Sequence, residues 1–172
     1  MQPDRFNNGK YVNWVKTSLS LLYLKEGITK FSNEKADVFH KDVTQLVRLR
    51  STKAVTTQCT NCTYKSAKKT NKNTTWRIAC ICNVCSVWLE EILPYHLHKP
   101  LPNIAWANSN PQLWPTDVWE LAKLFQPYGC ESHKNAEDSD CTALLTMMLN
   151  CTFFHTFLTN TARLQEVSCM AG

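Results

Sequence analysis

The sequence predicts a mainly α-helical protein in which a small metal-binding insert interrupts the helices. Two observations indicate the helical class: apolar residues recur at three- and four-residue intervals along most of the chain, and only residues 74–81 alternate as a strand would. Two Cys-x-x-Cys pairs near the middle predict the insert. With 172 residues and 44% hydrophobic content, we expect residues 1–172 to form one helical domain, with a zinc-binding insert at about 55–86.

Two helices are expected before the insert, over residues 11–26 and from Ser32 to about Val47. The apolar face of the first is made by residues at helical spacing: Val12, Val15, Leu19 and Leu22. We expect this face to be buried, and Gly27 follows where a glycine commonly ends a helix. Ser32 is a residue type that caps helix N-termini, and Glu34 near that end would interact favourably with the helix dipole.

The insert is predicted from four cysteines at the spacing of a zinc site. They form two pairs separated by nineteen residues: Cys59 with Cys62, and Cys82 with Cys85. Structural zinc is bound tetrahedrally by four such ligands, and a shell of four sulfurs leaves no open position for catalysis. We therefore expect one structural zinc ion, which would order a segment too polar to form a core of its own. Three other residues are close enough in sequence to replace one sulfur: Cys80, His96 and His98.

A disulfide framework or a redox pair is the alternative for these cysteines. The chain has nine cysteines, an odd number, and its first residues are polar rather than those of a signal peptide. We expect an intracellular protein, cytoplasmic or nuclear, in which thiols stay reduced unless a metal binds them. No apolar run approaches the roughly eighteen residues that indicate a membrane span, so no membrane association is predicted.

Positive charge is concentrated around the insert. Residues 43–89 contain eight of the 19 basic residues and no aspartate or glutamate, whereas the rest of the chain carries more acidic than basic residues. Five basic residues lie between the cysteine pairs: Lys65, Lys68, Lys69, Lys72 and Arg77. With Tyr64 and Trp76 beside them, they are typical of a loop that binds phosphates and stacks bases, so we predict a nucleic-acid contact. The alternative is a solvated linker kept soluble by lysine.

Residues 74–81, between the cysteine pairs, predict a short hairpin arm. Residues 84–93 predict a helix that begins inside the second pair and stops near Pro94. Tryptophans on the apolar faces of predicted helices are expected in the core: Trp14, Trp88 and Trp119. Trp106 and Trp114 stand in a proline-rich loop, and the sequence leaves their place open.

Two further helices are predicted toward the C-terminus. Thr116 is expected to cap one that runs over residues 118–125, before a proline and a glycine. Asp138 or Ser139 is expected to open the other, which continues toward Phe157. With these helices, the predicted core is built almost entirely from helical faces.

No catalytic motif surrounds any of the five histidines: His40, His96, His98, His133 and His155. A histidine among apolar residues, such as His155 after two phenylalanines, is more often structural than catalytic. The chain has only four glycines and no glycine-rich phosphate loop. We therefore predict a non-catalytic binding or scaffold module with no catalytic residue, and a zinc-dependent hydrolase is the alternative.

Several segments resemble an uncharacterised vertebrate family first named as a chromosome X open reading frame. They are residues 11–16, 82–96, 106–108, 111–125 and 144–151, which occur in the same order. The resemblance spans about residues 11–167 and implies a bundle similar to the HEPN-like domain of a RING ubiquitin ligase that binds RNA, with a cysteine knot inserted. RNA would then be the partner of the basic segment, with an acidic protein surface as the alternative. HEPN-like domains also tend to dimerise, so the resemblance implies a homodimer.

The chain departs from the HEPN pattern in two ways. HEPN ribonucleases pair an arginine with a histidine roughly one helical turn later, and no arginine here has such a histidine. Related chains also carry an Arg-Asn pair and a histidine in a last helix, whereas this sequence ends with residues 167–172. We expect a truncated or alternatively spliced form that lacks its final helix, and a divergent HEPN-type ribonuclease remains the alternative function.

Overall fold

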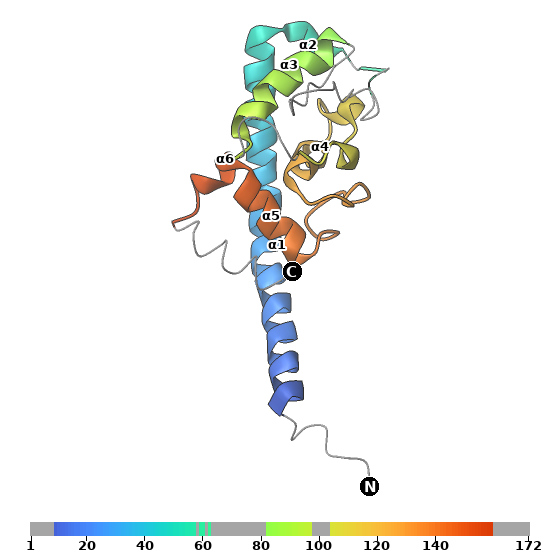
Figure 1. Ribbon diagram of the computed structural model, residues 1–172. Helices are drawn as coiled ribbons and strands as arrows, with labels where there is room; N and C mark the ends of the chain where they lie inside the picture. The colour runs from blue at the N-terminus through green and yellow to red at the C-terminus, as the bar shows by residue number, and fades with distance from the viewer. Residues whose placement is uncertain (1–8, 58, 61, 63–81, 98–103, 160–172) are drawn as a thin grey trace, which may run out of the picture.

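The computed structural model describes residues 9–57, 59–60, 62, 82–97 and 104–159 (Figure 1). Within these ranges the chain is mainly helical, as the sequence predicts, and its strand pairing is a single antiparallel bridge between His96 and Cys151. The hairpin arm expected at 74–81 and the end expected at 167–172 lie outside the described residues. None of the described helices is both long enough and apolar enough to cross a membrane.

The longest element is α1, a helix of 42 residues over Gly9–Arg50. The sequence predicted two helices here, and that prediction was wrong. Gly27 does not end a helix, because its φ is negative and the helix continues through it. Ser32 does not cap one either, since its hydroxyl donates to the carbonyl oxygen of Ile28 at 2.7 Å, within the same helix. A single glycine in a helix interior costs only about 1 kcal/mol, which packing along the rest of α1 can offset.

Among the described residues, other elements cover only the C-terminal half of α1. Its buried face consists of Ser32, Ala36, Phe39, Val43 and Val47. Figure 1 shows the N-terminal half extending beyond the other elements. The expectation that the first predicted helix is buried was therefore wrong, and so was the placement of Trp14 in the core, because 66% of this residue is exposed. Periodicity marks an apolar face, but it does not say whether anything covers that face.

Several short helices pack along the covered half of α1. They are α2 Thr52–Thr56, α3 Asn83–Ile92, α4 Val118–Ala122, α5 Cys141–Asn150 and α6 Thr152–His155. Four single 3-10 turns join or extend them: η3 Leu93–Tyr95, η4 Trp106–Asn108, η5 Pro111–Leu113 and η6 Lys123–Phe125. Helices α2, α3, α4 and α5 all contact α1, with α2 and α3 at its C-terminal end (Figure 1).

Two of the predicted helix starts are shifted by one or two residues. Asp117, not Thr116, caps α4, and its carboxylate accepts a hydrogen bond from the backbone N–H of Trp119 at 2.9 Å. Asp140, rather than Asp138 or Ser139, caps α5, because its carboxylate accepts from the N–H of Ala143 at 2.7 Å. The last predicted helix is also interrupted at Cys151, which ends α5 and caps α6.

The core is centred on the aromatic ring of Phe39. Its ring centroid lies 5.1 Å from that of Tyr95, 5.7 Å from that of Phe125 and 5.2 Å from that of Phe153. Trp88 and Trp119 are buried, which confirms two of the three predicted core tryptophans. Trp114, whose place the sequence left open, is also buried, while Trp106 is only partly covered and packs against the core.

Candidate metal centre

The four cysteines of the two Cys-x-x-Cys pairs come together in one cluster. Their Sγ atoms all lie within 4.8 Å of one another: Cys59, Cys62, Cys82 and Cys85. The Sγ of Cys82 lies 3.4 Å from that of Cys62 and 3.5 Å from that of Cys59. Tetrahedral zinc with Zn–S bonds of about 2.3 Å would separate its sulfurs by about 3.8 Å, so only small adjustments would accommodate the ion.

Each cysteine pair adopts the same local turn. The backbone N–H of Cys62 donates to the Sγ of Cys59, and the N–H of Cys85 donates to the Sγ of Cys82, both at 3.3 Å. Cys82 is also the N-cap of α3, so its sulfur lies at the positive end of the helix dipole.

Three segments of the chain hold the cluster in place. The indole N–H of Trp88 on α3 donates to the carbonyl oxygen of Ala54 on α2 at 2.8 Å, and this bond joins the elements next to the two pairs. From η5, the side-chain amide of Gln112 donates to the carbonyl oxygens of Thr60 at 3.1 Å and Cys62 at 3.4 Å. Gln112 therefore holds the first pair from η5, and it is a supporting residue that the cysteine spacing did not reveal.

Burial raises the pKa of the Cys62 thiol in the cluster. Three of the four cysteines are buried, and Cys82 is partly exposed. Desolvation, together with hydrogen bonds with Cys82 and Cys59, raises the pKa of the Cys62 thiol to about 11. A cation must therefore displace protons as it binds. Four sulfur donors in a tetrahedral arrangement suit zinc, and also iron or cuprous ions.

The alternative ligands do not join this cluster in the described part of the chain. Cys80 and His98 lie outside the described residues. His96 is buried elsewhere, where its ring stacks on Phe125 with centroids 5.6 Å apart and its backbone bridges to Cys151. The grouping favours the set predicted from the spacing.

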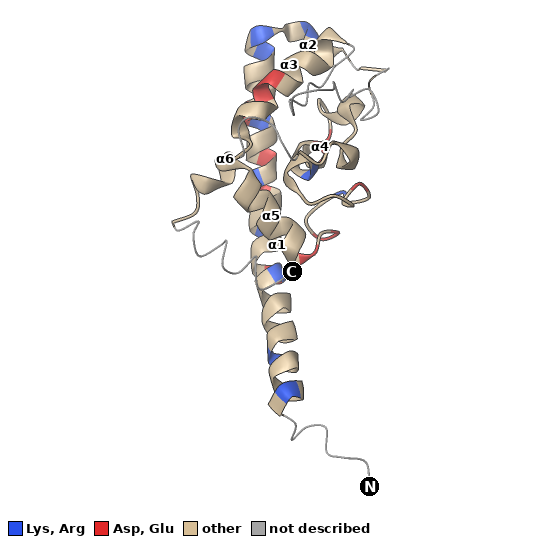
Figure 2. Cartoon of the chain, in the orientation of Figure 1, with Lys and Arg blue, Asp and Glu red and all other residues tan. Residues whose placement is uncertain are grey.

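The basic segment is only partly visible beside the cluster. The predicted nucleic-acid contacts lie outside the described residues: Lys65, Lys68, Lys69, Lys72 and Arg77. Of the described basic residues nearby, Arg48 and Lys53 are exposed, whereas Arg50 forms ion pairs with Glu90 and Glu91 on α3. Figure 2 shows these charges at the end where α1 meets α2. Positive charge therefore approaches the cysteine cluster from α1 and α2.

The described histidines are engaged by the fold. His40 Nε2 lies 2.8 Å from the carbonyl oxygen of Trp114, and His155 Nε2 lies 2.9 Å from that of Leu149. His133 Nδ1 lies 3.1 Å from the hydroxyl of Ser139, a pair that in an open site would suggest a nucleophile and its base. Ser139 is completely buried, so no substrate can reach its hydroxyl.

A buried ion pair, which the sequence analysis missed, holds the loop that supports the metal centre. Lys123 Nζ lies 2.6 Å from Glu120 Oε1 and donates to the carbonyl oxygen of Glu131 at 3.0 Å. The other carboxylate oxygen of Glu120 accepts from the N–H of Asn110 at 2.6 Å. Both charges are compensated by hydrogen bonds, as buried charges must be. Their i, i+3 spacing on α4 and η6 was the available signal, but the apolar neighbours obscured it.

Comparison with known proteins finds sequence relatives without an assigned role. A family model described as "Domain of unknown function (DUF4559)" matches residues 5–169. A mouse protein, "Uncharacterized protein CXorf38 homolog", is 30% identical over 150 residues, which cover 87% of this chain and 44% of that protein. The chain therefore spans less than half the length of this relative. No solved structure matches the chain.

Proposed function

The chain belongs to the DUF4559 family, whose function is unknown, and we propose that it is a non-catalytic binding module stabilised by one structural zinc ion. The observation that supports this most directly is the cluster of four cysteine sulfurs within 4.8 Å of one another. A closed shell of four thiolates leaves zinc no site for water or substrate, so the ion would act on folding rather than on chemistry. The described histidines form hydrogen bonds within the fold. This supports a binding module over the two alternatives, a divergent HEPN-type ribonuclease and a zinc hydrolase.

The metal is tested by native mass spectrometry of the purified chain. We expect one zinc per chain, and we expect it to be lost in Cys62→Ser and in Cys85→Ser. Cys130→Ser is the matched control, because this thiol is as buried as that of Cys59 but lies outside the cluster. A chain without metal, or a zinc that both Cys62→Ser and Cys85→Ser retain, would contradict the proposal.

For the binding partner we propose RNA. Two features of the sequence support this proposal. Residues 43–89 contain eight basic residues and no acidic one, and two aromatic residues lie between the cysteine pairs. The basic residues lie between the two cysteine pairs, so a zinc ion bound to both pairs would hold the two ends of this segment together. Its positive charges would then be presented as one surface. Phosphate contacts of this kind release counterions, so affinity should fall steeply as salt rises.

The RNA proposal is tested by titrating single-stranded RNA at several salt concentrations. Neutralising Lys65, Lys68, Lys69 and Lys72 to Gln should weaken binding and reduce the salt dependence by up to about three units of slope. The control neutralises four exposed lysines elsewhere, with the same change in net charge: Lys16, Lys30, Lys41 and Lys134. Equal losses in both variants would show only a net-charge effect, and binding of an acidic polypeptide in preference to RNA would replace RNA by a protein partner.

A further inference from the structure

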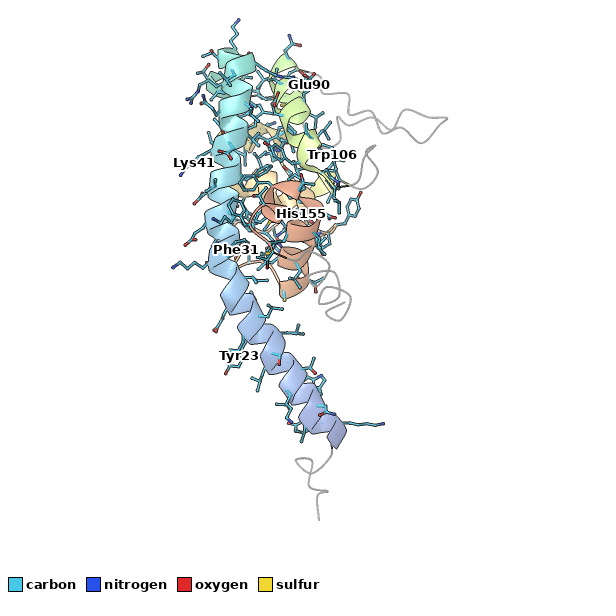
Figure 3. The ribbon with its side chains drawn as sticks, turned by 90° about the vertical axis from the view of Figure 1, so that its left-hand side faces the viewer. Tyr23, Phe31, Lys41, Glu90, Trp106 and His155 are labelled. Atoms are coloured by element: carbon cyan, nitrogen blue, oxygen red, sulfur yellow. The ribbon has the colours of Figure 1, made fainter. Side chains whose placement is uncertain are left out.

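The four cysteines of the metal centre differ in their access to solvent. Of the seven cysteines in the described ranges, six are buried and Cys82 is partly exposed. The other three members of the cluster are at most 6% exposed: Cys59, Cys62 and Cys85. Helix α3, which Cys82 caps, lies beside the C-terminal end of α1, and Figure 3 shows its Glu90 far from Tyr23 at the other end of the molecule. A dissolved oxidant therefore reaches Cys82 before the other sulfurs of the cluster.

Two sulfurs of the first cysteine pair lie close to that of Cys82. The Sγ of Cys82 is 3.4 Å from that of Cys62 and 3.5 Å from that of Cys59. A disulfide joins its sulfurs at about 2.05 Å, so an approach of about 1.4 Å would form a bond. Cys85 is fully buried, and its Sγ lies 4.0 Å from the carbonyl oxygen of Pro111 on η5. The geometry therefore favours a bond from Cys82 across to the first pair over one within its own pair.

The choice of partner matters for the basic segment. Cys62 and Cys82 stand immediately on either side of residues 63–81, which contain the predicted nucleic-acid contacts. A bond between these two cysteines would link the ends of the segment without a metal. Bonds formed within each pair would leave the two ends unlinked. The partner of Cys82 therefore decides whether the ends of the segment stay together when the metal is lost.

We propose that Cys82 is the oxidant-sensitive sulfur of the metal centre, and that hydrogen peroxide joins it to Cys62 and releases the zinc ion. The release of zinc rests on the proposed metal site, whereas the bond rests on the exposure of Cys82 and its distance from Cys62. The new bond then holds the ends of residues 63–81 together in place of the metal. The centre thus has two closed states, one metal-bound and one oxidised.

The reaction balances in two steps. Metal-bound cysteines are thiolates, and the thiolate of Cys82 attacks one oxygen of the peroxide. The O–O bond breaks, Cys82 becomes a sulfenic acid, and hydroxide leaves. The thiolate of Cys62 then attacks the sulfur of Cys82, the S–S bond forms, and a second hydroxide leaves. The two sulfurs lose two electrons, which reduce the peroxide to two hydroxide ions. Zinc keeps only two of its four sulfur ligands and therefore dissociates.

The proposal is tested by adding hydrogen peroxide in steps to the full chain loaded with zinc. An indicator dye measures the released zinc, and tandem mass spectrometry assigns the disulfide after the remaining thiols are alkylated. We expect one zinc ion released for each disulfide formed, with Cys82 joined to Cys62. Any other cysteine joined to Cys82, or zinc release without a disulfide, would overturn the proposal.

Two variants that keep all four ligands serve as controls, because replacing Cys82 itself would remove a ligand. Cys80→Ser tests the cysteine nearest to Cys82 in the sequence, and Cys130→Ser tests a buried thiol outside the cluster. Both variants should release zinc at the same peroxide concentration as the unchanged chain and form the same bond. Retention of zinc in Cys80→Ser would place the first oxidation at Cys80 and overturn the role of Cys82.

A failure of the metal centre can be told apart from a failure of this bond. If the chain binds no zinc, the proposed function is contradicted, and the same mapping on the reduced, metal-free chain still tests whether Cys82 joins Cys62. Limited alkylation of the zinc-loaded chain is an independent measurement. N-ethylmaleimide should label Cys82 before the other three cysteines of the cluster, because those three are buried. Simultaneous or later labelling of Cys82 would overturn it as the accessible sulfur.

Discussion

The two halves of α1 carry similar proportions of apolar residues, yet only one half is part of the core. On the C-terminal half, Phe39 and Val43 are almost completely buried, and Phe39 packs against Tyr95, Phe125 and Phe153. On the N-terminal half, Trp14 and Tyr23 are about two-thirds exposed. The helix is therefore continuous, but its two halves are stabilised by different interactions. Its C-terminal half is held by tertiary packing, and its N-terminal half is held mainly by its own backbone hydrogen bonds.

The largest effect that this comparison predicts is a difference in stability loss when two aromatic residues on α1 are each replaced by alanine. Phe39→Ala should lower the free energy of unfolding by about 3–5 kcal/mol, because it leaves a cavity among three other rings. Tyr23→Ala should change it by less than about 0.5 kcal/mol, because the side chain is exposed. Urea unfolding followed by circular dichroism measures both. Similar losses in the two variants would show that the N-terminal half is packed as tightly as the C-terminal half.

Removal of the metal should destabilise the elements at the C-terminal end of α1 and leave its N-terminal half unchanged. Zinc held at 100 times its dissociation constant stabilises a folded chain by about 2.7 kcal/mol, and a chelator removes that contribution. Hydrogen exchange should then speed up in α2 and α3, which flank the cysteine cluster, while exchange in residues 11–24 stays unchanged. Faster exchange along the whole of α1 would mean that the two halves are not energetically separate.

The stability of the folded chain should change with pH in opposite directions with and without the metal. With zinc, acid favours release, because protons compete for the four thiolates. Without zinc, the raised pKa of Cys62 means that the folded state holds its proton more tightly than the unfolded state does. That contribution to stability is present below the ordinary thiol pKa of 9.0 and is lost as the pH rises toward 11. Thermal unfolding of both forms between pH 5 and 11 measures it, and identical profiles would exclude the cluster as the metal site.

A smaller effect is expected from the residue that supports the first cysteine pair. Gln112→Ala removes two hydrogen bonds to backbone carbonyl oxygens next to the metal ligands and should weaken zinc binding about 10- to 100-fold. Competition with a fluorescent chelator measures the affinity. Asn33→Ala is the control, since this side-chain amide also bonds to a distant segment, accepting from the N–H of Ala136 and donating to the carboxylate of Glu137, away from the cluster. Equal zinc affinity in both variants would leave Gln112 as a general packing residue.

The sequence predicted those features that local chemistry determines. The cysteine spacing identified the four sulfurs that the structure groups, and the burial of Trp88 and Trp119 followed from apolar periodicity. The same periodicity misplaced Trp14, because it marks a face without revealing whether another element covers it. The support from Gln112 depends on a loop that folds back from a distant position, which no local pattern encodes, and the i, i+3 spacing of Glu120 and Lys123 does not reveal that this pair is buried.

The smallest effect concerns Gly27, which the sequence took for the end of a helix and the structure places inside α1. A methyl group at Gly27 would meet no atom within 4 Å, so Gly27→Ala should stabilise the helix by about 0.5–1 kcal/mol through the lower entropy of the unfolded chain. Gly129→Ala is the contrasting case. Its φ of 95° is strained for alanine, so the same change should destabilise despite equally open space. If Gly27→Ala also destabilised the protein in urea unfolding, the chain would break at Gly27, and the two halves of α1 would be separate helices as well as separate energetic units.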